Sequence, residues 1–149
     1  LTKIVGLRFF TVYGPWGRPD MAVYKFSNHL DLNKKINVYN YGDHSRDFSY
    51  IDDIITSIIL IIKKSNKLSR YQLFDIGKGK IDNLKNLIKL IEKNFKKKIK
   101  INKVSIQLGD VKKTKANIKN LKKLINFIPK TNLETGIKKF VTWYKNYHK

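Results

Sequence analysis

The chain has 149 residues, enough for one domain with a substantial hydrophobic core. It contains no cysteine, which excludes disulfides and thiolate metal sites and fits a reducing compartment such as the cytoplasm, the location we expect. The formal net charge is +21, but only four of the 32 basic residues are arginine, the residue that base-reading proteins use for bidentate contacts, so no nucleic acid is expected as a partner.

Short strands and helices alternate in the first third of the chain. Ile4–Phe10 is an unbroken apolar strand, which is typical of a parallel strand covered on both faces. After a Gly/Pro-rich loop, the apolar spacing predicts a helix over Met21–Leu32, with Asp20 at its N-cap. A short strand over Ile36–Tyr39 follows, and a turn then leads to an extended segment over Arg46–Ser49.

Asp52 and Asp53 precede the most apolar segment of the chain. The sequence predicts a helix over Ile54–Lys64 that is apolar on nearly every side, so we expect it to be buried between layers. Carboxylates at the positive end of a helix dipole explain the aspartate pair better than a catalytic dyad does. The uncharged run Ile54–Ile62 is far shorter than the roughly 20 residues needed to span a bilayer, so no membrane is expected as a partner.

The second half again alternates strands with helices, and no repeat or linker interrupts it. Asp82 or Asn83 is predicted to cap a helix that has lysines on a solvated face and, on its other face, Leu84, Leu87, Ile88, Ile91 and Phe95. The other predicted elements are a strand over Tyr71–Ile76, a turn over Gly77–Gly79, a half-exposed strand over Lys100–Ile106, and helices near Asn117–Leu124 and Leu133–Tyr147.

Three motifs place polar side chains on loops next to strands. In Leu7–Met21 (LRFFTVYGPWGRPDM), a buried strand ends in a Gly/Pro-rich loop, which is a common way to build a ligand site. In Tyr41–Asp53 (YGDHSRDFSYIDD), Arg46 follows a turn and Phe48 anchors its backbone, so the guanidinium is suited to a diphosphate. The third motif is Gln107–Val111 (QLGDV).

These motifs, together with Gly136–Tyr147, resemble those of nucleotide-sugar epimerases and dehydratases of the extended short-chain dehydrogenase/reductase superfamily, most closely UDP-glucuronate 4-epimerases. The resemblance implies an α/β fold: the C-terminal part of a Rossmann-like enzyme, with its last parallel strands plus the small substrate-binding α/β region. The sequence contains no Tyr-x-x-x-Lys and no Gly-x-x-Gly-x-x-Gly, and it starts at Leu1 without an initiator methionine. We therefore expect residues 1–149 to be a substrate-binding half, inactive alone, that lacks the N-terminal NAD-binding region and the catalytic residues.

The resemblance also implies roles for individual side chains. Arg46 would contact the nucleotide diphosphate, Asp110 would accept hydrogen bonds from the ribose hydroxyls, and Arg18 would pair with a C6 carboxylate of the sugar. The other implied substrate-binding residues are Thr11 at the sugar or its phosphate, Asn37, Val38 and Tyr39 by the nucleobase, and Gln107. Phe9 and Val12 would border the nicotinamide end of the NAD cofactor.

Several of these assignments have a structural alternative. The alternative for Arg46 is a surface ion pair with Asp47, that for Thr11 is a hydrogen bond to its own backbone, and that for Tyr39 is a place in the core. Leu108 stands where the family usually has proline, which should loosen the turn. No metal is predicted, since the three histidines lack metal-ligand spacing and are expected to be solvated: His29, His44 and His148.

The implied activity belongs to the full-length protein. It is an NAD-dependent 4-epimerase that acts on a UDP-sugar, expected to be UDP-glucuronate, by transient oxidation at C4 to a 4-keto sugar. The alternatives within enzymes are a UDP-glucuronate decarboxylase and a nucleotide-sugar 4,6-dehydratase, and the alternative outside enzymes is a lysine-rich nucleic-acid-binding module. We expect the full-length protein to be a homodimer.

Overall fold

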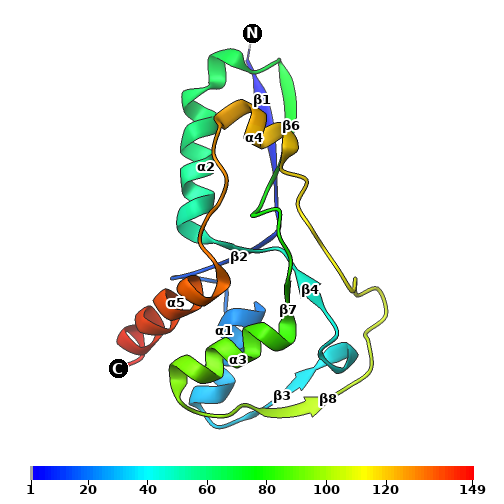
Figure 1. Ribbon diagram of the computed structural model, residues 1–149, viewed down its shortest axis with the longest axis vertical. Helices are drawn as coiled ribbons and strands as arrows, with labels where there is room; N and C mark the ends of the chain where they lie inside the picture. Colours follow the sequence, from blue (N-terminus) through cyan, green and yellow to red (C-terminus); the bar gives the residue numbers. More distant parts are fainter. Residues whose placement is uncertain (1) are drawn as a thin grey trace.

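A two-stranded parallel sheet and two helices form the first of two lobes, drawn at the top of Figure 1. The computed structural model describes residues 2–149, in which β1 (Ile4–Phe9) pairs in parallel with β6 (Tyr71–Ile76). Helix α2 (Ile51–Lys63) and the short helix α4 (Lys119–Ile125) pack with this sheet. Partly buried side chains of β1 pack against one core, whose buried members come from α2, β6, α4 and the loop before β6: Ile54, Ile61, Leu68, Phe74, Ile76, Leu121 and Ile125.

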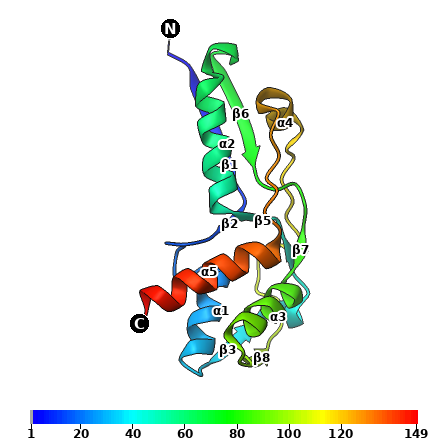
Figure 2. The same ribbon diagram turned by 60° about the vertical axis from the view of Figure 1, so that its left-hand side comes forward.

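The second lobe holds a larger core between three helices and a second parallel pair of strands. Helix α5 (Leu133–Tyr147) lies across α1 (Ala22–Asp31) and α3 (Leu84–Phe95), as Figure 2 shows. Strands β3 (Lys35–Val38) and β8 (Lys100–Lys103) run alongside them. Burial of apolar side chains in this core, among them Leu87, Ile91, Ile137 and Phe140, is the main stabilising contribution to the lobe.

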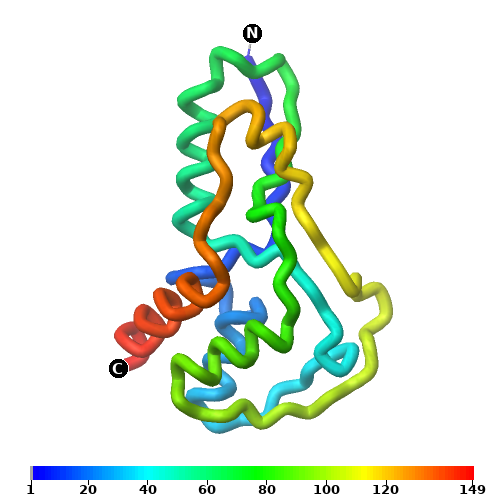
Figure 3. Tube along the Cα trace, viewed as in Figure 1, coloured from blue at the N-terminus to red at the C-terminus, as the bar shows by residue number. Residues whose placement is uncertain are grey.

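Two short strand pairs lie where the lobes meet. Strand β2 (Thr11–Tyr13) pairs in parallel with β5 (Phe48–Tyr50), and β4 (Ser45–Arg46) pairs antiparallel with β7 (Asp82–Asn83). Figure 3 shows that the chain passes repeatedly from one lobe to the other, so neither lobe is a continuous stretch of sequence. Two short 3-10 segments complete the described elements: Tyr39–Gly42 and Ser65–Lys67.

Local chemistry sets the helix ends. The Asn83 side chain accepts a hydrogen bond from the N–H of Lys85 at 2.7 Å, and this settles which of the two predicted caps begins α3. The predicted cap of α1 is wrong: Met21 occupies the N-cap position without a side-chain cap, because the Asp20 carboxylate pairs with Arg18 instead.

Helix α2 is not buried on nearly every side, as the sequence predicted. Among the residues that the structure describes, nothing covers the stripe formed by Ile55, Ile59 and Ile62, which are 47%, 46% and 64% exposed. Strand β1 is likewise open rather than covered on both faces, since Ile4 and Phe9 are exposed. The physical reason is that the sheet of this lobe has only two strands here, too few to cover the helix.

Candidate functional site

Arg46 and Asp110 lie 64 positions apart in the sequence and meet at the junction of the lobes. Nη2 of Arg46 donates to Oδ1 of Asp110 at 2.9 Å, and Nη1 donates to the carbonyl oxygens of Ser45 and Lys112 at 3.1 Å. Both charged side chains are partly open to solvent, 22% and 30% exposed. The guanidinium is therefore held in a fixed orientation with part of its surface free to meet a ligand.

Backbone pairing places Asp110 beside Arg46. The N–H of Ser45 donates to the carbonyl of Lys112 at 2.9 Å, and the N–H of Thr114 donates back to Ser45 at 3.2 Å. A second contact closes the turn before this stretch, because the N–H of Asp110 donates to the carbonyl of Gln107 at 3.1 Å. The segment after β8 thus forms an isolated parallel β-bridge with β4, between Lys113 and Ser45.

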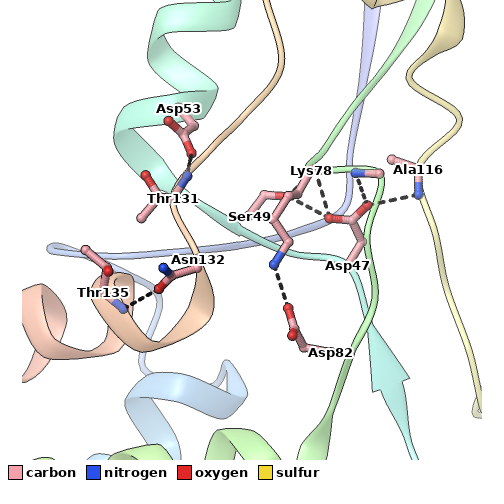
Figure 4. Close-up of polar contacts among 10 residues, drawn as sticks. Asp47, Ser49, Asp53, Lys78, Asp82, Ala116, Thr131, Asn132 and Thr135 are labelled. Carbon is pink, nitrogen blue, oxygen red and sulfur yellow. Dashed lines mark hydrogen bonds and ion pairs between the residues drawn. The ribbon is translucent and has the colours of Figure 1, made fainter.

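A buried carboxylate one residue further along fixes the same junction. Asp47 is fully buried and does not pair with Arg46, so the surface ion pair considered as an alternative is wrong. Figure 4 shows its contacts, which are all with neutral donors. They are the hydroxyl of Ser49 at 2.8 Å and the backbone N–H groups of Lys78, Gly79 and Ala116 at 2.9, 2.8 and 3.2 Å.

Asp47 therefore ties the loop after β6 and the segment that carries Asp110 to strand β5. Sequence reasoning missed this residue. The signal available was a carboxylate directly before an apolar strand segment that proved to be buried.

His44 is buried, contrary to the expectation that all three histidines are solvated. Its side chain is 6% exposed, and Nε2 lies 3.1 Å from Oδ2 of Asp110. The other two histidines make local contacts: Nδ1 of His29 lies 2.9 Å from the carbonyl of Lys25, and Nε2 of His148 lies 2.9 Å from the Tyr24 hydroxyl. Residues 2–149 contain no cluster of three or more histidine, cysteine or acidic side chains that could hold a metal ion.

A second candidate region is an apolar cavity of about 420 Å³ beside α2. Phe9, Val12 and Arg18 line it, together with Trp16 and isoleucines of α2. The Arg18 side chain is 75% exposed and pairs with Asp20 at 2.6 Å, and this contact raises the pKa of Arg18 and lowers the pKa of Asp20. The cavity is thus lined mainly by apolar side chains, and Arg18 adds a guanidinium to this lining.

Tilted and edge-on aromatic contacts hold the loop that carries Arg18. Trp16 packs against Trp143 and Tyr147 of α5, with ring centroids 5.4 and 5.1 Å apart. Trp16 adopts a left-handed backbone conformation (φ 61°), which is unusual for a bulky side chain. The C-terminal helix is thus in direct contact with the loop of the first motif.

The structure brings some predicted site residues together and separates others. Arg46 and Asp110 form an ion pair, whereas Arg18 lies with Phe9 and Val12 in the cavity, which Arg46 does not line. Thr11 lies between the two groups, because its N–H donates to the carbonyl of Asp47 at 3.1 Å.

The predicted nucleobase residues lie near the start of the segment that leads to Asp110. Val38 is buried, and its carbonyl accepts from the N–H of Val104 at 3.1 Å. Tyr39 is half-buried and outside the hydrophobic cores, so its alternative place in the core is wrong. The exposed Asn37 accepts a hydrogen bond from Asn102 at 2.9 Å, and Gln107 is exposed.

Parallel strands, a Gly/Pro-rich loop after the first of them and an arginine–aspartate pair at the lobe junction define an α/β protein of the Rossmann-like class. The sequence model of the NAD dependent epimerase/dehydratase family matches residues 2–77, just over half of the chain. The chain belongs to this family.

Known proteins resemble the chain over nearly its whole length. It is 45% identical over 142 residues to an uncharacterized protein of Methanocaldococcus jannaschii, covering 95% of this chain and 43% of the relative. It is 41% identical over 159 residues to UDP-glucuronate 4-epimerase 1 of Arabidopsis thaliana, covering 97% and 37%. The chain spans less than half the length of these relatives.

A solved structure agrees in fold. The UDP-glucuronic acid 4-epimerase of Bacillus cereus, in complex with UDP-glucuronic acid and NAD, is 30% identical, with a TM-score of 0.86 over 95% of this chain and 45% of that chain. This likeness confirms the predicted fold class, the C-terminal part of an extended short-chain dehydrogenase/reductase. The family is NAD-dependent, and this solved relative contains NAD.

No helix formed by residues 2–149 combines the length and the apolar character needed to cross a bilayer.

Proposed function

We propose that this chain is the UDP-sugar-binding half of an NAD-dependent 4-epimerase whose substrate is UDP-glucuronate. The observation that carries the proposal is the Arg46–Asp110 pair, a guanidinium and a carboxylate held side by side by backbone pairing. A guanidinium offers a planar set of donors to a diphosphate, and a carboxylate accepts two hydrogen bonds from a vicinal diol. The diphosphate and the ribose diol of a nucleoside diphosphate would thus each find a partner within one short stretch of surface.

The sugar would extend from this pair toward Thr11 and the apolar cavity. Arg18 is the basic side chain that lines this cavity, and it could exchange Asp20 for the C6 carboxylate of a uronic acid. The Arabidopsis relative is named a UDP-glucuronate 4-epimerase, and the Bacillus relative was solved with UDP-glucuronic acid, which supports the same substrate.

The cavity walls also fit one end of NAD. Phe9 and Val12 present an apolar face suited to a flat aromatic ring such as nicotinamide, and the cavity is lined by the side of α2 that nothing covers among residues 2–149. NAD, when bound, supplies reversible hydride acceptance from the sugar. The residues described here would shape that end of the cofactor site and exclude water from it.

We further propose that an N-terminal NAD-binding half covers the exposed stripe of Ile55, Ile59 and Ile62. An apolar stripe of this kind on a helix normally packs against another layer of the fold. The catalytic Tyr-x-x-x-Lys would belong to that half, so residues 1–149 alone should be inactive. The cytoplasmic location and the homodimer remain predictions.

Calorimetric binding of UDP-glucuronate tests the proposal. Binding should persist at high salt, fall at least about tenfold on Arg46→Ala, and remain unchanged on Arg70→Ala, an exposed arginine directly before β6. A nucleic-acid-binding module would instead bind DNA or RNA with an affinity that falls steeply as salt rises. Absence of UDP-glucuronate binding to the full-length protein would refute the proposal.

Product analysis on the full-length protein distinguishes the enzymatic alternatives. A 4-epimerase yields a UDP-uronic acid that keeps its carboxylate and has the opposite configuration at C4. A decarboxylase yields a UDP-pentose with release of carbon dioxide, and a 4,6-dehydratase yields a 4-keto-6-deoxy sugar.

A further inference from the structure

His44 lies behind the Arg46–Asp110 pair, on the side away from solvent. The two oxygens of the Asp110 carboxylate face different partners: Oδ1 accepts from Arg46 at 2.9 Å, and Oδ2 lies 3.1 Å from Nε2 of His44. The imidazole is 6% exposed, against 22% for the guanidinium. One carboxylate is thus held between an always-charged group and a group that can gain or lose its charge.

The contact between His44 and Asp110 is an ion-pair distance without an aligned hydrogen bond. Nε2 of His44 is buried and makes no hydrogen bond of good geometry among residues 2–149. The short distance is enough for attraction between two opposite charges, because Coulomb attraction depends on separation and charge more than on direction. A neutral ring gains little from this arrangement, and a lone pair on Nε2 would be repelled by the carboxylate, whereas an imidazolium is attracted to it.

We propose that His44 is a positioning residue for Asp110 and that its protonation strengthens the binding of a nucleoside diphosphate sugar. This inference rests on the proposed function. When the free surface of the Arg46 guanidinium meets a diphosphate, its positive charge is shared with the ligand, so Asp110 loses part of its compensating charge and a protonated His44 supplies it. The same positive charge lies behind a site that receives a dianionic group, so it also favours the ligand directly.

The surroundings of His44 contain other charged groups, on every element packed against it. They are Asp43 before it, Arg46 on β4, Asp82 on β7 opposite Arg46 with its ion-pair partner Lys78, Lys85 at the start of α3, and Asp110, Lys112 and Lys113 on the segment after β8. Carboxylate, ammonium and guanidinium groups ordinarily keep one charge between about pH 5.5 and about pH 8, whereas imidazole ordinarily changes its charge there. A pH response of ligand binding in that window would therefore arise from the histidine.

Calorimetry with UDP-glucose on the full-length protein tests this role. UDP-glucose is the probe because its diphosphate is esterified at both ends and does not titrate in this window, unlike the terminal phosphate of UDP. The wild-type protein should bind it about fivefold more tightly near pH 5.5 than near pH 8. His44→Gln keeps an amide donor of similar reach but no titratable charge, so its affinities at the two pH values should be nearly equal. His29→Gln removes a histidine outside the site and should keep the wild-type response.

A second measurement on the wild-type protein does not depend on a variant that folds. Because linkage is reciprocal, saturation with UDP-glucose should raise the pH at which the His44 ring titrates, followed by nuclear magnetic resonance. An unchanged titration midpoint, or an unchanged pH response in His44→Gln, would overturn the role of His44 while the proposed function stands. Failure of the wild-type protein to bind UDP-glucose at either pH would overturn the proposed function and this inference with it.

Discussion

The buried carboxylate of Asp47 accepts the backbone N–H of Ala116, a residue 69 positions further along the chain. The same carboxylate accepts the N–H groups of Lys78 and Gly79, so one side chain connects three segments. No cation contacts it among the residues that the structure describes, and its charge is stabilised by neutral donors alone. The position of Asp110 beside Arg46 depends on this connection.

Replacement of Asp47 by alanine should destabilise the fold strongly. The backbone N–H groups of Gly79 and Ala116 would lose their acceptor, that of Lys78 would keep only the Ser49 hydroxyl, and we expect a loss of about 3 kcal/mol or more in the free energy of unfolding. Urea denaturation measures this loss. Asp43→Ala is the matched control, because the Asp43 side chain is exposed and should change stability by less than about 0.5 kcal/mol. Equal effects of the two substitutions would contradict the role of Asp47.

At Gly136, replacement by alanine should change the stability in the direction opposite to that expected from helix propensity. Alanine normally stabilises a helix interior by about 1 kcal/mol relative to glycine. Here a Cβ at Gly136 would collide with the hydroxyl of Tyr13, a side chain that is 4% exposed. We therefore expect Gly136→Ala to destabilise by about 1–3 kcal/mol.

Tyr13→Phe provides the partner for a double-mutant cycle. The Tyr13 hydroxyl is buried and has no hydrogen-bond partner among residues 2–149, so its removal alone should be neutral or stabilising. In the Tyr13→Phe background, Gly136→Ala should lose part of its effect, because the hydroxyl makes the closest of the clashes. Strict additivity of the two changes in thermal denaturation would rule out the contact.

The sequence predicted the features that local signals determine. Helix α3 (Leu84–Phe95) contains the predicted apolar face, and one of its two predicted caps, Asn83, begins it. Asp47 and His44 escaped prediction because their partners come from segments 31 to 69 positions away, which no local pattern reveals. The expected burial of α2 failed for a different reason: the pattern records where apolar residues lie, not which layers of the fold the chain contains.

The predicted site residues divide in a similar way. Arg46 and Asp110 were assigned to neighbouring parts of one ligand, and the structure pairs them. Arg18 lies in a separate cavity with its side chain toward solvent, and its assignment to the sugar carboxylate stays a prediction. A ligand that reaches from one group to the other would have to pass Thr11, whose backbone joins β2 to the Asp47 junction.

Arg18→Ala tests the substrate class in the full-length protein. Loss of a bidentate partner for a carboxylate should lower kcat/KM for UDP-glucuronate about a hundredfold. The affinity for UDP-glucose, which has no carboxylate, should change by less than about threefold. Arg18→Lys should be intermediate, since it keeps the charge without the planar fork. Equal losses for both sugars would remove the carboxylate role.

Three buried tyrosines predict how the fold responds to alkali. Burial raises the pKa of Tyr13, Tyr50 and Tyr144, that of Tyr144 to about 12. For Tyr144 the folded-state pKa exceeds the unfolded value of about 10, so the stabilising effect of its protonated form is full below about pH 10 and is lost as the pH rises through about 12.

A spectrophotometric titration of tyrosinate should therefore show a late phase that coincides with loss of near-ultraviolet circular dichroism. Tyr144→Phe should reduce the late phase. Ionisation of all eight tyrosines in one reversible phase near pH 10 would show that burial has no such effect.

Ile59 and Ile61 lie two positions apart on α2 and face opposite sides of it, 46% and 4% exposed. In the 149-residue chain, Ile61→Asn should destabilise by about 3 kcal/mol, because it places an amide in the first core, whereas Ile59→Asn should change stability by less than about 0.5 kcal/mol. In the full-length protein the difference should nearly vanish, with Ile59→Asn now destabilising by about 2 kcal/mol, because the NAD-binding half would cover its stripe. Urea denaturation of both forms measures the contrast. A harmless Ile59→Asn in the full-length protein would mean that this face of α2 stays open and that the NAD-binding half packs elsewhere.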